Sequence, residues 1–343
     1  MGQKNNIDEK KISRKRFFQI CGSVLAGTSI LSVSGFSLWK IIQANKGTGK
    51  LSSSSVKPIQ DHFSSPYKLI SSFGTDLIEA FELYEEQLFV VTPNAVSVYD
   101  TAGRLLNNFP VASQVRDMVV RDRQIWLLYP SRIESYTLQG ELIREWDACS
   151  ELSDYCSMAV TSGSVFVTDV AMKNICQYTE EGNFVRFIQS PNGFIIPSYS
   201  FGIESMGETI YCSNSGRHLV ESYSIDGEYI GAFGQPGGAP GLFAGCCNPV
   251  HLSGSPNGEL ITSEKGNPRI SCYTPDGQFR SVLLDKKLLG GGKAAYEVRM
   301  KDDKMYVAGN GMVSVFRFDP LLAASSACSG CGVTCPLRKG ITI

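Results

Sequence analysis

The sequence predicts an all-β fold, a six-bladed β-propeller that occupies residues 66–320. Three observations predict it. A short segment ending in an aromatic residue recurs six times, most copies are followed by a tight-turn signal, and one surplus strand at the start matches one missing strand at the end. A period of about 42 residues built from short strands is typical of a propeller or a solenoid.

The recurring segment is a four-residue strand pattern whose last residue is aromatic. Its six aromatic residues, 37 to 50 residues apart, are Tyr99, Tyr136, Tyr178, Tyr223, Tyr273 and Phe316. The first five segments are followed by a residue pair that favours a tight hairpin, and the glycines of these pairs are Gly103, Gly140, Gly182, Gly227 and Gly277. Two apolar runs precede each segment, so each repeat is predicted to be a four-stranded antiparallel sheet.

The two ends of the repeat region complement each other. The sixth repeat stops at Pro320 after its third strand, whereas residues 67–74 form a lone strand that resembles the fourth strand of a later repeat. Pairing this strand with the last repeat would close the ring and leave no open sheet edge. A solenoid would instead require capping repeats. We therefore predict that strand 67–74 completes the sixth blade.

The fifth repeat carries a resemblance to a known family. Residues 233–243 read FGQPGGAPGLF, and NP, NPRI and DG follow at 248–249, 267–270 and 276–277. This unit resembles an NHL repeat, and the other five units match it in outline. The resemblance implies an NHL-like propeller. Such propellers include scaffolds, ligand binders and a few lyases or hydrolases, so the fold alone does not name a function.

Residues 1–42 predict an export signal. A basic cluster at residues 10–16 precedes residues 20–39, which hold no charged side chain. Residues 13–19 resemble a twin-arginine (Tat) signal, with Lys15 where the second arginine usually stands. The apolar stretch is close to the roughly 20 residues that span a bilayer, and no Ala-x-Ala type of cleavage triplet follows it.

We therefore expect a signal anchor, in preference to a cleaved signal, that tethers an extracytoplasmic or periplasmic protein to the cytoplasmic membrane. Residues 43–65 are expected to form the linker between this segment and the propeller.

The charge distribution argues against a nucleic-acid partner. The whole chain holds 32 Lys and Arg against 33 Asp and Glu, but residues 1–42 hold seven basic and two acidic residues. Residues 43–343 hold 25 basic and 31 acidic residues, and no basic cluster that could neutralise phosphates stands out there. The hydrophobic content of 43% and the 34 glycines indicate a folded, turn-rich chain.

The predicted topology gathers several reactive residue types on one face of the ring. Loops that lead from one blade to the next share this face with loops between second and third strands. The ligand candidates on this face are Cys246, Cys247, Asn248, His251, Glu264, Lys265, Asp169 and Asn214. Most are expected to be solvated loop residues. Glu264 and Lys265, beside the cysteine pair, form the main concentration of reactive side chains.

Eleven cysteines are unusual for one chain of this size. Cys246 and Cys247 could be small buried thiols, form a disulfide, or ligate a metal or redox centre. Cys149 and Cys156 bracket a polar loop and are predicted to pair as a local disulfide in an oxidising compartment. The cysteines inside predicted strands, Cys176, Cys212 and Cys272, are expected in the core.

Residues 321–343 form a cysteine-rich tail with the spacing Cys328-x2-Cys331-x3-Cys335-Pro. This spacing resembles the last three ligands of the bacterial ferredoxin run, with Ser325 in the place of the first cysteine. The tail could hold an iron–sulfur cluster or another metal with a fourth ligand from elsewhere. It could instead undergo disulfide or thiol redox chemistry, or be inert.

Three functions follow from these features. The favoured one is an exported, membrane-tethered propeller that binds a partner protein or a ligand, as part of an envelope redox complex, with a metal or iron–sulfur cluster in its tail. The alternative is an extracytoplasmic lyase or hydrolase with its site on the face bearing Cys246, Cys247 and Glu264, although only three histidines are available for a zinc site. A polysaccharide or ligand sensor is the third. No catalytic residue is assigned.

Overall fold

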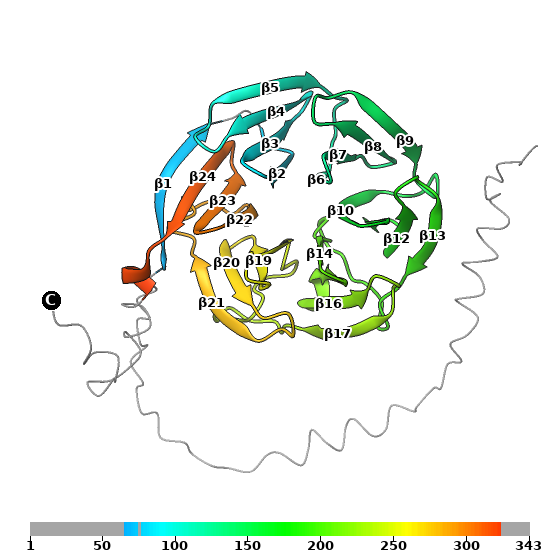
Figure 1. Ribbon diagram of the computed structural model, residues 1–343. Coiled ribbons are helices and arrows are strands. Elements are labelled where there is room, and N and C mark those ends of the chain that lie inside the picture. The colour runs from blue at the N-terminus through cyan, green and yellow to red at the C-terminus, as the bar shows by residue number, and fades with distance from the viewer. Residues whose placement is uncertain (1–64, 75–76, 324–343) are drawn as a thin grey trace, which may run out of the picture. The chain divides into compact units, whose positions relative to one another are not determined.

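The structure, a computed structural model, describes residues 65–74 and 77–323. Six sheets, each of four antiparallel strands, surround a central channel (Figure 1). In each of blades 1 to 5 the strands follow chain order from the channel outward. The predicted all-β six-bladed propeller is therefore confirmed.

The four positions in a blade are occupied as follows. The first, innermost strands are β2 (Ala80–Tyr84), β6 (Asp117–Arg121), β10 (Tyr155–Thr161), β14 (Ile203–Met206), β18 (His251–Gly254) and β22 (Glu297–Lys301). The second strands are β3 (Gln87–Thr92), β7 (Gln124–Leu128), β11 (Ser164–Asp169), β15 (Thr209–Asn214), β19 (Leu260–Glu264) and β23 (Lys304–Gly309). The third strands are β4 (Ala95–Asp100), β8 (Arg132–Thr137), β12 (Asn174–Thr179), β16 (Leu219–Ser224), β20 (Arg269–Tyr273) and β24 (Met312–Phe318). The fourth, outermost strands are β5 (Leu105–Pro110), β9 (Leu142–Asp147), β13 (Phe184–Ile188), β17 (Tyr229–Phe233), β21 (Phe279–Leu284) and β1 (Tyr67–Gly74).

The sixth blade is built from both ends of the described chain. β1 pairs antiparallel with β24, from Tyr67 opposite Phe318 to Gly74 opposite Met312. The blade therefore contains β22, β23, β24 and β1, the strand expected to close the ring. Pairing β1 with β24 supplies the fourth strand that the last repeat lacks, so β24 is not left as an open edge.

The recurring aromatic segments lie in the third strands, and the hairpin turns after them pack against the outermost strand of the preceding blade. Gly140 follows β8 with a φ of +90°, and a Cβ there would lie 2.3 Å from Phe109 Cγ of the preceding blade. The Phe109 ring in turn packs beside Tyr136, with ring centroids 6.1 Å apart. A glycine is required at this turn both by its positive φ and by the packed aromatic ring.

The hydrophobic core lies between blades, in six clusters of buried side chains. Between blades 1 and 2, for example, Phe89 and Val91 pack with Met118 and Leu127. One face of each first strand is used in this packing, so its other face is left to line the channel.

Several sequence predictions fall outside the described residues. These are the export signal at 1–42, almost all of the linker at 43–65, and the tail cysteines Cys328, Cys331 and Cys335. Within residues 65–74 and 77–323, no helix has the length and apolar character needed to cross a membrane.

Candidate functional site in the central channel

The first strands place polar side chains in the channel by simple alternation. In β6, Met118 and Val120 are buried in the core, whereas Asp117, Val119 and Arg121 line the channel. Successive side chains of a strand point to opposite faces, so every second residue reaches the channel. An inner strand can therefore be apolar on one side and charged on the other.

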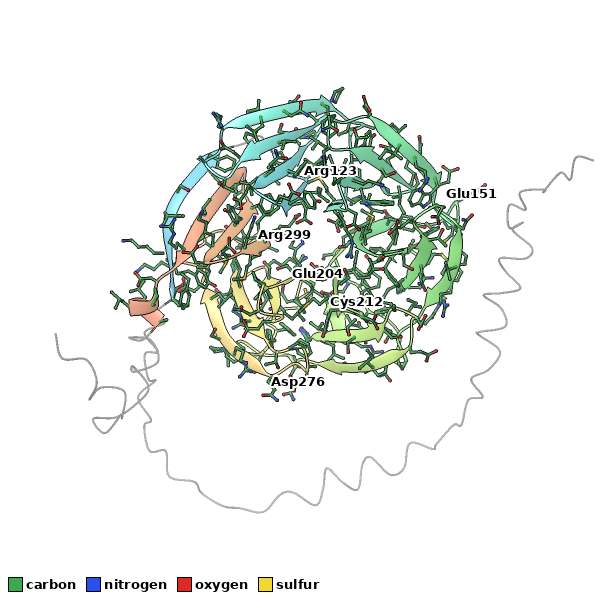
Figure 2. The ribbon with its side chains drawn as sticks, viewed as in Figure 1. Arg123, Glu151, Glu204, Cys212, Asp276 and Arg299 are labelled. Carbon is green, nitrogen blue, oxygen red and sulfur yellow. The ribbon has the colours of Figure 1, made fainter. Side chains whose placement is uncertain are left out.

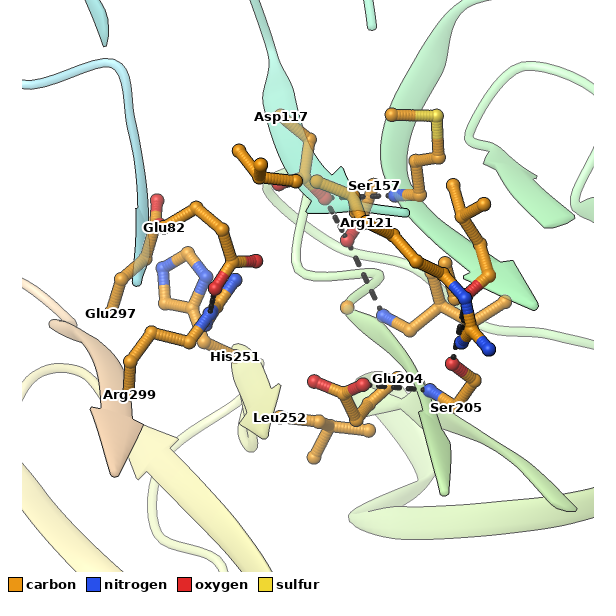
Figure 3. Close-up of a pocket in the computed structure, with 17 residues that line it drawn as sticks. Glu82, Asp117, Arg121, Ser157, Glu204, Ser205, His251, Leu252, Glu297 and Arg299 are labelled. Atoms are coloured by element: carbon orange, nitrogen blue, oxygen red, sulfur yellow. Dashed lines mark hydrogen bonds and ion pairs between the residues drawn. The ribbon is translucent and has the colours of Figure 1, made fainter. Parts of the chain in front are cut away.

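The channel encloses a cavity of about 190 Å³ that is lined from all six blades (Figure 3). Its ionisable lining residues are Glu82, Asp117, Arg121, Glu204, His251, Glu297 and Arg299. Figure 2 shows Glu204 and Arg299 beside the central opening, with Asp276 and Glu151 at the outer rim. Most small-molecule pockets have a mainly apolar lining with a few polar groups, and this one differs by its density of charge.

An ion pair joins blades 1 and 6 across the channel wall. Arg299 Nε lies 2.7 Å from Glu82 Oε1, and the side chains are 17% and 12% exposed. Burial lowers the pKa of Arg299, but the carboxylates of Glu82, Glu204 and Glu297 outweigh burial and raise it. Arg299 is therefore a permanent positive charge in the cavity.

Two further carboxyl groups line the cavity without an ion-pair partner among the described residues. Glu297 Oε2 accepts a hydrogen bond from Phe81 N at 2.9 Å, and Glu204 Oε1 accepts one from Ser205 N at 2.9 Å. Burial, against the opposing charge of Arg299, raises the pKa of Glu204 to about 7. Burial and the nearby Asp117 raise the pKa of Glu297 to about 8. Both groups therefore change charge near neutral pH.

Asp117 has a structural role in the same wall. Its Oδ2 accepts hydrogen bonds from Ser157 Oγ at 2.6 Å and from Met158 N at 2.8 Å, and its Oδ1 accepts one from Met118 N at 2.8 Å. These contacts join blade 2 to blade 3. Because both oxygens are occupied by the protein, Asp117 is less free to meet a ligand than Glu204 or Glu297.

His251 is the one sequence candidate that the fold brings into this cavity. It begins β18, and its imidazole makes no hydrogen bond to any described residue. Burial, with the charges of Arg299 and Lys265, lowers the pKa of His251 to about 4. The imidazole is therefore neutral at physiological pH, so one ring nitrogen can donate a hydrogen bond while the other accepts one.

The candidates Asp169, Asn214 and Glu264 occupy equivalent positions at the ends of second strands, and they are buried rather than solvated. Asp169 Oδ1 accepts hydrogen bonds from three backbone amides, including Met172 N at 3.0 Å. Asn214 donates to Gly193 O at 3.1 Å and accepts from Ile195 N at 2.9 Å. Buried backbone groups need hydrogen-bond partners. Both side chains supply such partners and so hold the loops in place.

Glu264 is occupied in the same way. It forms a buried ion pair with Arg269, which faces it across β19 and β20. Arg269 also donates to Gly238 O and Ala239 O at 3.1 Å, and Glu264 Oε2 accepts from Ala244 N at 3.1 Å. The pair thus holds the segment before β18 against blade 5.

Asn248 and Lys265 complete this arrangement. Asn248 Oδ1 accepts from Lys265 N at 2.9 Å, and Lys265 Nζ lies 2.9 Å from Ser200 Oγ. Nearby, Cys246 is exposed and Cys247 is buried, and their sulfur atoms are 3.4 Å apart as free thiols. Glu264 and the cysteine pair therefore do not converge with the channel residues on one cavity.

The predicted Cys149–Cys156 disulfide is not formed in the structure, where both residues are free thiols. Cys149 packs against the core between blades 2 and 3, and its sulfur lies 3.6 Å from that of Cys176. Cys156 packs between blades 3 and 4, and its sulfur lies 3.1 Å from Tyr199 O. The two residues are close in sequence but belong to different inter-blade cores.

The charged channel residues other than His251 are not among the candidates that the sequence indicates. Glu82, Glu204 and Arg299 stand at the same level of the ring, each opposite an aromatic residue of the second strand. The sequence feature that could have identified them is a charged residue in the middle of a short, otherwise apolar strand. Among the described residues, no group of three or more His, Cys, Asp or Glu side chains is arranged to hold a metal ion.

Comparisons with known proteins identify the fold but no family. No family model matches the chain, and no curated protein matches its sequence. Virginiamycin B lyase from Staphylococcus aureus is 11% identical, with 73% of this chain and 99% of that chain covered and a TM-score of 0.53.

Two other enzymes are similar in structure. Streptogramin B lyase is 14% identical, with 74% and 98% of the two chains covered and a TM-score of 0.51. A luciferin-regenerating enzyme is 13% identical, with 74% and 94% covered and a TM-score of 0.51. At these identities the likeness extends to the propeller fold alone.

Proposed function

We propose that this protein binds a small amine-bearing molecule in its central channel. The observation that carries the proposal is the pair of carboxyl groups of Glu204 and Glu297, which line one cavity without an ion-pair partner among the described residues. A carboxyl group kept from water raises its pKa because its charged form is destabilised. A bound ammonium group would restore the charged form, so both residues are suited to a cation.

The other channel groups support a small, polar ligand. Arg299 is already paired with Glu82, Arg121 is paired with Asp122, and His251 is neutral. Unpaired negative charge therefore predominates once Glu204 and Glu297 ionise. The cavity of about 190 Å³ resembles in size an engineered cavity of about 150 Å³ that holds benzene. A ligand of about six to ten non-hydrogen atoms therefore fits better than a polymer.

The binding proposal can be tested by thermal unfolding of the full chain with putrescine and ethanolamine as amine probes and 1,4-butanediol as the neutral control. We expect a saturable rise in Tm with an amine and none with the diol. The rise should be lost in a Glu204→Gln, Glu297→Gln double variant and kept in Glu141→Gln, which removes an exposed carboxyl group from an outer turn. An equal response to amine and diol, or an unchanged response of the double variant, would contradict the proposal.

A second candidate function is acid–base catalysis at the same residues. Carboxyl groups with pKa values of about 7 and 8, in the same cavity as a neutral imidazole, have the properties of a general acid and base at neutral pH. A variant of the S. aureus lyase in which one histidine is replaced by alanine is described as catalytically inactive, which makes His251 the residue to test first here.

Catalysis can be assayed as lactone opening or elimination, with δ-valerolactone as the first probe. Turnover that follows a bell-shaped pH profile and is lost in His251→Ala and Glu297→Gln would favour the lyase or hydrolase function. An equal turnover rate in the wild type and in both variants would show that His251 and Glu297 are not catalytic.

The cellular setting is also part of the proposal. We propose that a Tat-like signal in residues 1–42 exports an NHL-like propeller and tethers it to the cytoplasmic membrane, where an envelope protein or redox complex is its partner. Fractionation of cells that express the full chain tests this setting, with Arg14→Gln, Lys15→Gln as the double variant. If the twin-arginine-like signal directs export, the double variant should accumulate in the cytoplasm. Equal export of the wild type and the double variant would contradict the proposed signal.

We propose further that Cys328, Cys331 and Cys335 ligate an iron–sulfur cluster or another metal. Anaerobic purification followed by analysis of iron, sulfide and zinc and a visible spectrum tests this proposal. A metal-free protein, or a Cys331→Ser variant with unchanged metal content, would argue against it.

A further inference from the structure

Cys149 and Cys176 form a thiol pair outside the central channel. Their sulfur atoms lie 3.6 Å apart in the core between blades 2 and 3. Cys149 lies in the loop after β9 and is half-buried, whereas Cys176 lies in β12 and is fully buried. One thiol is therefore partly accessible to solvent while the other is behind it.

Two tyrosine hydroxyls hold the accessible cysteine in position. The hydroxyl groups of Tyr155 and Tyr178 are hydrogen-bonded to each other, and both accept from Cys149 N, at 3.1 Å and 2.9 Å. The Tyr155 hydroxyl also donates to Cys149 Sγ at 3.7 Å. On the buried side, Asn174 Oδ1 lies 3.5 Å from Cys176 Sγ. The main chain and the sulfur of Cys149 are thus both fixed relative to Cys176.

The same contacts make the two thiols chemically unequal. A hydrogen bond with Cys176, opposed by burial and aided by the tyrosine hydroxyls, lowers the pKa of Cys149 to about 6. The pKa of Cys176 is raised by that hydrogen bond and by burial. Cys149 is therefore the thiolate of the pair at neutral pH, and Cys176 keeps its proton. A partly accessible thiolate beside a buried thiol is the arrangement of an attacking and a resolving cysteine.

We propose that Cys149 and Cys176 are a redox-active thiol pair that a small disulfide oxidant, such as oxidised glutathione, converts into a Cys149–Cys176 disulfide. The Cys149 thiolate attacks one sulfur of the oxidant, forms a mixed disulfide and releases one thiolate, which takes up a proton. Cys176 then loses its proton and attacks Cys149 Sγ, which releases the second thiol. Two protein thiols are oxidised to one disulfide, and one oxidant disulfide is reduced to two thiols.

The geometry favours this pairing over the Cys149–Cys156 disulfide. Closure requires the sulfur atoms to move from 3.6 Å to about 2.05 Å, a change within the reach of side-chain rotation in a loop. Cys156 is instead committed to a different core, where its sulfur contacts Tyr199 O at 3.1 Å.

The pairing can be identified by peptide mapping of the full chain. The protein is treated with oxidised glutathione, its remaining thiols are alkylated in denaturant, and it is digested with trypsin. Cleavage after Arg144, Lys173 and Arg186 separates peptide 145–173, with Cys149 and Cys156, from peptide 174–186, with Cys176. We expect these two peptides to be linked, and further cleavage after Tyr155 should assign the bond to Cys149. A loop within peptide 145–173, or a Cys149 that is still alkylated, would overturn the proposal.

Variants provide an independent readout. Cys176→Ser should abolish the linked peptides and leave Cys149 as a stable mixed disulfide with glutathione, whereas the matched control Cys156→Ser should keep the link. In the reduced protein, the rate of iodoacetamide reaction at Cys149 should reach half its maximum near pH 6. In Cys176→Ala, which has no side-chain donor, this midpoint should move upward by about one pH unit or more. An unchanged midpoint in Cys176→Ala would refute the assigned interaction even if that variant folds poorly in part, because the alkylation rate can be restricted to the folded fraction.

Discussion

Replacing Glu297 with glutamine should remove a pH dependence from the folding equilibrium. In the folded protein, burial and Asp117 raise the pKa of Glu297 from 4.5 to about 8. The unfolded chain therefore releases this proton at a lower pH than the folded chain does. Between these values the folded state binds more protons, so the wild-type free energy of unfolding falls as the pH rises. Glutamine has no proton to lose, and this contribution disappears.

The magnitude follows from the two pKa values. Over most of the interval, each pH unit reduces the free energy of unfolding by about 1.4 kcal/mol. From pH 5 to pH 7 the sum is about 2.5 kcal/mol, because the unfolded-state group is only partly ionised at pH 5. Because Glu297 is only partly buried, solvent screening reduces this figure, so the expected change lies between about 1 and 2.5 kcal/mol.

The assay is urea unfolding at pH 5 and pH 7, followed by the fluorescence of Trp126, in the core between blades 2 and 3, and of Trp146, which packs against that core. The stability of Glu297→Gln relative to the wild type should increase by the stated amount between the two pH values. The control Glu141→Gln, at an exposed turn, should show no such increase. A relative stability of Glu297→Gln that is the same at both pH values, within about 0.5 kcal/mol, would refute the reasoning.

Two further changes test how the blades are held. Gly140→Ala should destabilise the fold more than Gly163→Ala by about 1 to 3 kcal/mol in urea unfolding, because both glycines have a positive φ but only the Cβ at 140 meets a packed ring; equal losses would contradict the packing argument. Arg269→Met should cost about 3 to 5 kcal/mol, since it leaves Glu264 buried without its partner. The double variant Glu264→Leu, Arg269→Met should recover much of that loss, and a double variant as unstable as the single one would show that the ion pair is not the cause. At the channel, amine binding to Glu204 and Glu297 should release protons near pH 7, measurable by calorimetry in buffers of different ionisation enthalpy; the same heat in every buffer would contradict the linkage.

The blade pattern could be predicted because it is local. Each aromatic marker segment lies in a third strand, and each turn signal that follows it is a hairpin, since alternation and turn residues act over a few positions. The surplus strand at residues 67–74 could also be read from the sequence, because the last repeat lacked one strand. These features depend on periodicity, which a single chain displays without any alignment.

The candidate site was only partly predictable. His251 was identified, but Glu82, Glu204, Glu297 and Arg299 were not, because they come from first strands far apart in the sequence. Each of these charges stands alone in its own repeat. Their shared cavity exists only when six blades are arranged in a ring, so no spacing rule within one repeat could reveal it.

The sequence by itself determined the repeat, the strand count and the positions of the turns, because these depend on residue type and short-range order. Only the tertiary structure decided which side chains meet. Glu264, expected among reactive solvated residues, is buried against Arg269 because antiparallel pairing of β19 and β20 sets them opposite each other. Cys149 faces Cys176, 27 residues away, rather than Cys156, because neighbouring blades bury different sides of one sheet.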